Sequence, residues 1–334
     1  MKIKLSFARL VFSALFVFGV LQYATALEIP FEIETRDICK KYFETAQILY
    51  FSNFKNAMQN CYSENFVSWG FDFVKTEKGN TILRYIILKN TDTLKEQKFF
   101  YVNGRIMSEP LKNSWEDFSP LYAESYGKNI LNPNEMSHTK KKIIANLGKT
   151  ENRRSNKPSS FILVQNFIFN AETQLQIEQE LVRISFLGER ITVHYKIRPA
   201  LYRVEDKLKK EATTDWQVRA FIERPHTITG YNWREVRDSY QRSAHSWGLS
   251  IDYLEDENIR SSKQIYWRWA KGFYDDEWVT IPIKKRWLPS EKVIAIFESE
   301  GFVWGGKWEL WDNMHFEYRP EVLYMSSHMA MPKN

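Results

Sequence analysis

The sequence predicts an α+β protein in which strands and helices follow one another without regular βαβ units. Between residues 161 and 334, stretches with helical periodicity alternate irregularly with stretches rich in β-branched and aromatic residues. This order favours an antiparallel sheet flanked by helices over a doubly wound parallel sheet. The pair Gly305-Gly306 lacks the spacing and the following helix of a phosphate-binding loop. Hydrophobic residues make up 43% of the chain, which is typical of a globular protein with a real core.

The first 26 residues predict a secretory signal peptide. Three basic residues precede an apolar run at 10–21, and Ala24-Thr25-Ala26 offers small residues at a cleavage site. The run is shorter than the roughly 20 apolar residues that cross a bilayer. An uncleaved anchor is the alternative. We therefore expect a periplasmic or secreted protein, with no membrane span in the mature chain.

The net charge does not indicate a nucleic-acid partner. The formal charge is +6, and three of the positive charges lie in the leader, which leaves about +3 on the mature chain. Nucleic-acid binders usually carry a concentrated basic stripe. The one compact basic cluster here is Lys140–Lys142 with Arg153 and Arg154, in a stretch that we predict to be a loop. We expect no binding of nucleic acid.

Residues 27–126 form an N-terminal region without a chemical motif. Apolar residues spaced three and four apart predict a helix over 37–62. The runs 81–88 and 99–102 are rich in β-branched and aromatic residues and predict strands. Asn103-Gly104, directly after the second run, predicts a turn. This region is therefore expected to be mixed α/β, with an unknown role.

The two cysteines of the chain are Cys39 and Cys61. In an exported protein, an even number of cysteines indicates a disulfide. Two cysteines without neighbouring histidines make a poor metal site. We expect a structural Cys39–Cys61 bridge that stabilises the N-terminal region.

A polar linker is predicted at residues 127–160, where asparagine, lysine and serine dominate. The following residues, 161–334, are predicted to form the catalytic domain. Within it, 171–183 has helical character, 190–195 reads as a strand, and 199–210 is expected to be a short helix with one apolar face.

Residues that suit a hydrolytic zinc site lie in the last third of the chain. Such a site needs three protein ligands, an open position for water and a nearby carboxylate that takes the proton of that water. His245 and Asp252 are separated by a turn that contains Gly248. His315 is the third candidate ligand, and Asp312, three residues before it, is the candidate base.

Two motifs around these residues resemble those of a known peptidase family. Ser243-x-His245-x-x-Gly248-x-x-x-Asp252 resembles the Ser-x-His-x-x-Gly-x-Ala-x-Asp signature of VanY-type D-alanyl-D-alanine carboxypeptidases and related L-alanyl-D-glutamate endopeptidases. Residues 301–316 resemble the second signature, Gly-Phe-x-Trp-Gly-Gly-x-Trp…Asp-x-x-His-Phe. The two motifs occur in the expected order.

The resemblance covers about residues 160–320 and has structural implications. It implies the fold shared by these peptidases and the hedgehog signalling domain, a small antiparallel sheet flanked by helices with zinc on one face. It also implies that His245, Asp252 and His315 bind Zn²⁺ and that Asp312 is the catalytic base.

Three further site residues are expected. Arg234 matches the family's arginine upstream of the first motif and would hold the substrate carbonyl or stabilise the oxyanion, although it could be a surface cation. Ser243 resembles the serine that contacts substrate or supports the first ligand. Trp304 is one of four tryptophans that could stack on substrate, although at least two of the four are expected to fill the core.

We make a prediction of lesser weight for each of three other residues in the motifs or close to them. Ser250 replaces the usual alanine of the first motif, a change that we expect to be harmless. Lys307 stands where many members carry aspartate, and this could shift the charge preference for substrate. Glu317 is an alternative base near His315, but we expect it to orient a ligand histidine.

The sequence therefore predicts a zinc-dependent peptidase that hydrolyses peptidoglycan peptides. Carboxypeptidase and endopeptidase activity both stay open, although an aspartate base resembles the endopeptidase branch. One alternative is a non-catalytic, zinc-containing module that binds cell wall or a protein. Another is a structural protein whose N-terminal region does the main work. The intact Asp312 favours an enzyme over the binding module.

Overall fold

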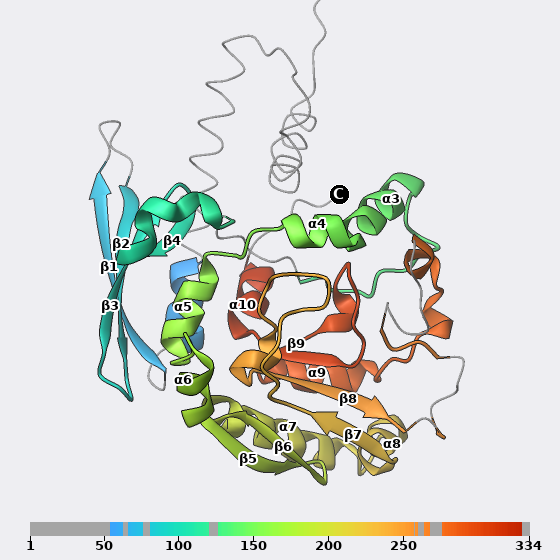
Figure 1. Ribbon diagram of the computed structural model, residues 1–334. Helices are drawn as coiled ribbons and strands as arrows, with labels where there is room; N and C mark the ends of the chain where they lie inside the picture. Colours follow the sequence, from blue (N-terminus) through green and yellow to red (C-terminus); the bar gives the residue numbers. More distant parts are fainter. Residues whose placement is uncertain are drawn as a thin grey trace, which may run out of the picture.

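The computed structural model describes residues 54–62, 66–75, 81–119, 126–256, 258–259, 264–267 and 276–328. These residues form an α+β structure with two four-stranded antiparallel sheets and a two-stranded hairpin (Figure 1). The predicted fold class is confirmed. The predicted signal peptide lies outside the described residues. Among those residues, no helix combines the length and apolar character that a bilayer span requires.

The first sheet is a meander in which each strand pairs with the next one in sequence. Its strands are β1 (Val67–Lys75), β2 (Thr81–Asn90), β3 (Glu96–Val102) and β4 (Arg105–Ser108). The predicted turn at Asn103-Gly104 is confirmed, since both residues have positive φ, as a tight hairpin of this type requires. Ile86 and Phe99, which are paired in register and fully buried, help to form the core face of this sheet.

A helix at residues 54–62 packs against this sheet and is the described part of the helix predicted over 37–62. Its apolar face buries Phe54, Met58 and Tyr62. Cys61 lies near its end as a free thiol, and Cys39, its expected partner, lies outside the described residues. The Cys39–Cys61 bridge therefore stays a prediction.

Residues 127–160, predicted to be a polar linker, contain two helices. These are α3 (His138–Gly148) and α4 (Thr150–Ser155). The α3 helix begins after Ser137, whose side chain accepts a hydrogen bond from a backbone amide of the first turn. The loop predicted at Lys140–Lys142 is therefore wrong. Only two of the 11 residues of α3 are buried, so its apolar periodicity is too weak to see in the sequence.

The second half of the chain forms a hairpin and the second sheet. The strands are β5 (Leu181–Phe186), β6 (Glu189–His194), β7 (His226–Thr229), β8 (Ser250–Glu255), β9 (Phe302–Trp304) and β10 (His315–Tyr318). In the second sheet the strand order is β7-β8-β10-β9, so the last two strands are exchanged relative to the sequence.

Helices surround these sheets. The α-helices not yet given are α5 (Phe161–Ile168), α6 (Gln174–Gln179), α7 (Arg198–Glu211), α8 (Trp216–Glu223), α9 (Glu291–Ser299) and α10 (Pro320–His328). The 3-10 helices are η2 (Glu109–Asp117), η3 (Tyr195–Ile197), η4 (Ala244–Trp247), η6 (Asp276–Thr280), η7 (Ile283–Lys285) and η8 (Gly305–Lys307). The helix predicted at 171–183 is shorter than expected, because β5 already begins at Leu181, whereas the strand at 190–195 and the helix at 199–210 are confirmed to within one or two residues.

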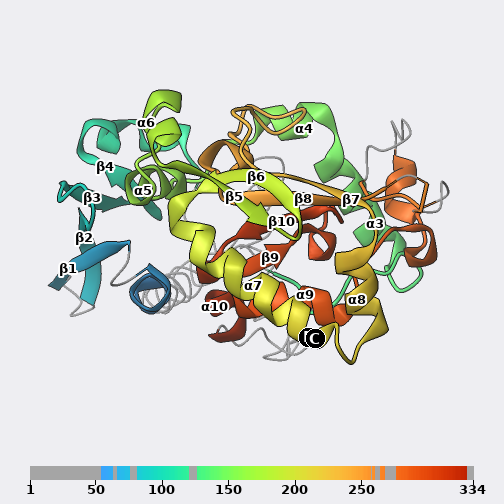
Figure 2. The same ribbon diagram turned by 90° about the horizontal axis from the view of Figure 1, so that it is seen from below.

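One face of the second sheet is covered by α7, α8 and α9 (Figure 2). Phe316 of β10 stacks on Phe297 of α9 with ring centroids 4.0 Å apart, and Tyr253 of β8 stacks on Phe221 of α8 at the same distance. Because side chains alternate along a strand, the neighbours of these aromatic residues point to the opposite face. Asp252 and His315 therefore lie on the face that these helices do not cover.

Candidate metal centre

The structure brings His245, Asp252 and His315 together. Asp252 and His315 are directly opposite each other in the pairing of β8 with β10, and His245 comes from η4, just before β8. One ligand atom of each residue lies within 4.8 Å of the others. Nε2 of His245 is 3.1 Å from Asp252 Oδ2, and Nδ1 of His315 is 2.8 Å from Asp252 Oδ1. Among the described residues this is the one group of three or more potential ligands found.

A glycine turn directs His245 towards the strand that carries Asp252. Gly248 ends η4 with φ +63°, a conformation that favours glycine. A Cβ atom at this position would also lie 2.6 Å from the backbone nitrogen of His194 on β6. Only a residue without a side chain fits this close approach, which explains the glycine in the first motif.

The ring nitrogens of the two histidines have distinct partners. Nδ1 of His245 lies 2.6 Å from the carbonyl oxygen of Gly230 and donates to it, which leaves Nε2 as a ligand atom. This Nε2 is buried, and its 3.1 Å contact with Asp252 Oδ2 does not have the geometry of a hydrogen bond. Nε2 of His315 lies 3.4 Å from Glu317 Oε2, so its Nδ1 faces the cluster. The predicted orienting role of Glu317 agrees with this contact.

The electrostatics of the cluster favour a bound cation. Burial would raise the pKa of Asp252, but His245 and His315 hold it well below its usual value. Burial also opposes a charge on His315, yet the hydrogen bonds that its ring donates to Asp252 and Glu317 outweigh the effect of burial and raise the pKa of His315 to about 10. Two imidazoles and one carboxylate form a ligand set that zinc accepts in hydrolytic sites. The residues present therefore fit a divalent metal of this kind.

Asp312, the predicted base, lies in the turn that leads into β10. Its backbone amide donates to the Gly305 carbonyl at 3.0 Å, and its own carbonyl accepts from the His315 amide at 3.3 Å. Its carboxylate also contributes to the raised pKa of His315. The structure thus places the candidate base beside the third ligand, as the spacing of the second motif predicts.

Trp304, predicted to bind substrate, is fully buried. Its Nε1 donates to the Asn313 carbonyl at 2.7 Å, and its ring packs against Gly306. The predicted substrate contact is therefore wrong, because the ring is a core element beneath the turn. Trp308 is the alternative candidate for a substrate contact. Its side chain is partly exposed, and its ring centroid lies 5.4 Å from that of His315.

Arg234 and Ser243 support the same loop with their backbones. The Ser243 amide donates to the Arg234 carbonyl at 3.0 Å, and the Arg234 amide donates to Ser246 Oγ at 2.8 Å. The Arg234 side chain is exposed and donates to the carbonyl of Glu235. Ser243 is only 4% exposed, which fits support of His245 better than contact with substrate. The catalytic role of Arg234 stays a prediction.

Arg242 is a structural residue of the site that the sequence did not suggest. Its guanidinium lies 4.1 Å from the ring centroids of both Trp233 and Trp247. It donates to the Ala171 carbonyl and to Asn166 Oδ1, which connects the loop before η4 to α5 and to the residues that follow this helix. The only sequence signal was its position directly before the first motif.

A cleft of about 580 Å³ borders the cluster. Ala244, Trp308 and Glu317, which adjoin or contact the two histidines, line it. Part of its other wall comes from Phe54 and Phe161, so both halves of the chain contribute.

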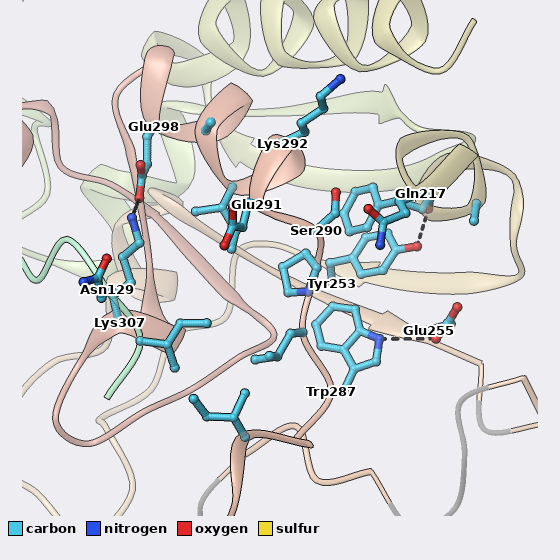
Figure 3. A pocket seen from close by; sticks show the side chains of 18 of the residues that line it. Asn129, Gln217, Tyr253, Glu255, Trp287, Ser290, Glu291, Lys292, Glu298 and Lys307 are labelled. Carbon is cyan, nitrogen blue, oxygen red and sulfur yellow. Dashed lines mark hydrogen bonds and ion pairs between the residues drawn. The ribbon is translucent and has the colours of Figure 1, made fainter. Parts of the chain in front are cut away.

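A larger cavity of about 1190 Å³ lies elsewhere, and neither this cavity nor the cleft is lined by the three cluster residues themselves. Figure 3 shows Tyr253, Trp287 and Lys307 among its lining residues. Lys307 pairs with Glu298 at 2.5 Å in this cavity, not in the cleft beside the cluster. Because this charge is paired with Glu298, the influence of Lys307 on the charge preference for substrate stays a prediction.

Comparison with known proteins supports the resemblance for the segment that holds the site. Residues 237–318 match a family model described as D-alanyl-D-alanine carboxypeptidase. This segment contains His245, Asp252, Asp312 and His315, and its match supports a peptidase. No curated protein and no solved structure matches the chain.

Proposed function

We propose that this protein is a zinc-dependent peptidase that hydrolyses the peptides of peptidoglycan. The observation that supports this most strongly is the convergence of His245, Asp252 and His315 beside a cleft, with Asp312 in the adjoining turn. The family match over residues 237–318 supports the peptide substrate. The predicted signal peptide supports a place of action in the periplasm or outside the cell.

The mechanism assigns roles to five residues and to the metal that three of them would hold. When bound, zinc would polarise the scissile carbonyl and lower the pKa of the attacking water. His245 Nε2, the Asp252 carboxylate and His315 Nδ1 would hold it. Asp312 takes the proton of the water as the new bond forms and gives a proton to the departing amine. Glu317 keeps the ring of His315 in the orientation that leaves Nδ1 available.

Arg234 is our candidate for stabilising the negative charge that develops on the carbonyl oxygen. Its exposed side chain donates to the carbonyl of Glu235 and pairs with no acidic side chain of the described residues. The side chain would have to turn towards the cleft when substrate binds. Arg234→Lys, which keeps the charge but loses the planar guanidinium, tests this assignment through kcat.

Digestion of purified peptidoglycan by the zinc-loaded chain from residue 27 onward tests the proposal. Mass spectrometry of the products distinguishes release of terminal D-alanine from cleavage after L-alanine or within a cross-link. Asp312→Ala is the control, and we expect it to lose activity by about 10²- to 10⁴-fold while zinc stays bound. An active Asp312→Ala variant would show that the assignment of the base is wrong.

The second candidate function is a non-catalytic module with a structural zinc. The low exposure of His245 and His315, 2% and 7%, is the observation that favours it. A folded, zinc-bound protein that releases no fragment from peptidoglycan would support this module and refute the peptidase.

A further inference from the structure

A continuous chain of buried polar side chains leaves the cluster at His315. Its first contact is between Nε2 of His315 and Oε2 of Glu317, 3.4 Å apart. The other oxygen of Glu317, Oε1, accepts from Nη1 of Arg319 at 3.3 Å. All three residues follow one another on alternate positions of β10 and its end, which places them on the same face of the sheet.

The chain continues to the N-terminal helix at residues 54–62. Nε of Arg319 donates to Oε1 of Glu321, at the start of α10. The second oxygen of Glu321, Oε2, accepts from the hydroxyl of Tyr62 at 2.5 Å, across 259 positions of sequence. Both oxygens of Glu317 and of Glu321 are therefore engaged, and Tyr62 lies at the far end.

Burial makes these contacts depend on one another. The side chains of Glu317, Arg319 and Glu321 are 13%, 14% and 6% exposed, and Tyr62 is fully buried. One guanidinium is shared by two carboxylates, so a change at one carboxylate alters the position and charge balance of the other. Loss of one partner leaves a buried charge uncompensated, which drives its neighbours to rearrange.

Packing holds the Tyr62 side chain in place at the far end of this series of polar contacts. Its ring makes edge contacts with Phe66 and Phe169 at centroid distances of 5.5 and 6.2 Å. Burial, together with the negative charge of Glu321, raises the pKa of Tyr62 well above its usual value, so its hydroxyl keeps the proton that it donates. The same helix also contributes Phe54 to the cleft beside the cluster.

We propose that Tyr62 is a positioning residue of the metal centre, which acts through Glu321 and Arg319 on the Glu317 carboxylate and so on His315. This inference rests on the metal-binding part of the proposed function, and it extends the working site to a helix outside the segment that matches the peptidase family. The N-terminal region is then a component of the centre and not only a scaffold.

Tyr62→Phe removes the hydroxyl and keeps the packed ring. Tyr126→Phe is the control, because the Tyr126 hydroxyl also donates to a glutamate, Glu298, at 2.5 Å, and accepts from the Trp304 amide at 2.9 Å, outside the series of contacts that ends at His315. Zinc affinity is measured on the full chain by competition with a chromophoric chelator, in the absence of peptide. The Tm of each metal-free variant measures how much stability is lost with the hydroxyl group, separately from any effect on zinc binding.

Loss of a residue that directly orients a ligand typically weakens metal binding about 10- to 100-fold, and this is the result expected for Glu317→Gln. For Tyr62→Phe, which acts through two further residues, we expect about a 3- to 10-fold loss of zinc affinity. With saturating zinc, kcat falls by a similar factor and KM is retained. Tyr126→Phe loses at least as much thermal stability, because its hydroxyl makes two hydrogen bonds, but it binds zinc like the wild type.

Equal thermal losses in Tyr62→Phe and Tyr126→Phe, with wild-type zinc affinity in both, would overturn the proposal and leave Tyr62 a structural residue. Glu321→Gln provides a second variant if Tyr62→Phe does not fold, since it keeps the size and an acceptor for Tyr62 but loses the charge that holds Arg319. Weakened zinc binding in Glu321→Gln supports the proposal, and unchanged binding refutes it. A wild-type protein that binds zinc but cuts no peptide refutes the peptidase alone, whereas one that binds no zinc refutes the centre and this inference together.

Discussion

The two four-stranded sheets of the molecule differ in length and in what they bury. The strands of the first sheet reach ten residues, and its core face is apolar, as at Ile86 and Phe99. The longest strand of the second sheet has six residues, and polar side chains such as His315 are buried on and around it. Long strands gain stability from many regular pairings, whereas short ones bring loop residues such as His245 within reach of the sheet. The candidate metal site therefore lies on the sheet with the shorter strands.

The largest expected effect comes from removing a ligand in the second sheet. We expect His315→Ala to weaken zinc binding by more than about 100-fold, beyond the usual effect of changing a residue that only orients a ligand. His226→Ala is the control in the same sheet, because His226 contacts two backbone carbonyls and stacks on Tyr253. Equal zinc affinities of the two variants, measured by chelator competition, would contradict the assigned ligand set.

The tight turn of the second sheet is also expected to be sensitive to one added methyl group. In Gly306→Ala the new Cβ would lie 2.2 Å from the Trp304 ring, which is fully buried and has no room to move. Overpacking of this kind costs about 1–3 kcal/mol. Gly127→Ala is the control, since its Cβ would meet its closest neighbour at 3.4 Å. Chemical denaturation measures both, and equal costs would contradict the packing of Gly306 against Trp304.

The cluster should give the metal-free protein a distinctive dependence on pH. Because the folded-state pKa of His315 is raised to about 10 from 6.5, its charged form contributes stability that is complete below about pH 6.5. That contribution is lost as the pH rises towards 10. Zinc binding becomes stronger over the same range, because fewer protons must be displaced. The difference in Tm between zinc-loaded and metal-free protein should therefore widen from pH 7 to 9, whereas a constant difference would argue against this role of His315.

The smallest effect is expected from a substitution in the first sheet, which should change stability but neither zinc binding nor peptidase activity. Leu94 has φ +58° and is 67% exposed in the turn before β3. Asparagine tolerates this backbone conformation better than leucine does. Leu94→Asn should therefore stabilise the fold by about 0.5–1 kcal/mol. Zinc affinity and peptidase activity should stay at wild-type values. A change in either of them would show that the two sheets are less independent at this point than the structure indicates.

The site was more predictable from the sequence than much of the fold. His245, Asp252, Asp312 and His315 lie in two short motifs, so local spacing and the family resemblance were enough to predict them, and the structure brings His245, Asp252 and His315 together. The burial of Trp304 was not predictable, because a tryptophan near a site can stack on a ligand or fill a core, and only the packing decides.

Contacts over long sequence distances were beyond local pattern reading. The hydrogen bond between Tyr62 and Glu321 joins residues 259 positions apart, and neither residue lies in a motif. The α3 helix was missed for the opposite reason, since its lysine-rich sequence buries too little to show a periodic apolar face. The mixed order of strands and helices was sufficient for the fold class, but not for the strand order β7-β8-β10-β9.

The close approach of Gly248 to β6 has a consequence for recombination between related enzymes. A Cβ at Gly248 would meet the His194 backbone nitrogen at 2.6 Å, and one at Gly230 would meet the Thr192 carbonyl at 2.3 Å. The loop that carries the first motif, and Gly230 before it, thus pack closely against a hairpin from outside the matched segment. A chimaera that exchanged residues 237–318 alone would place a foreign loop on this hairpin. Grafting should succeed only when β5 and β6 are transferred with the motifs.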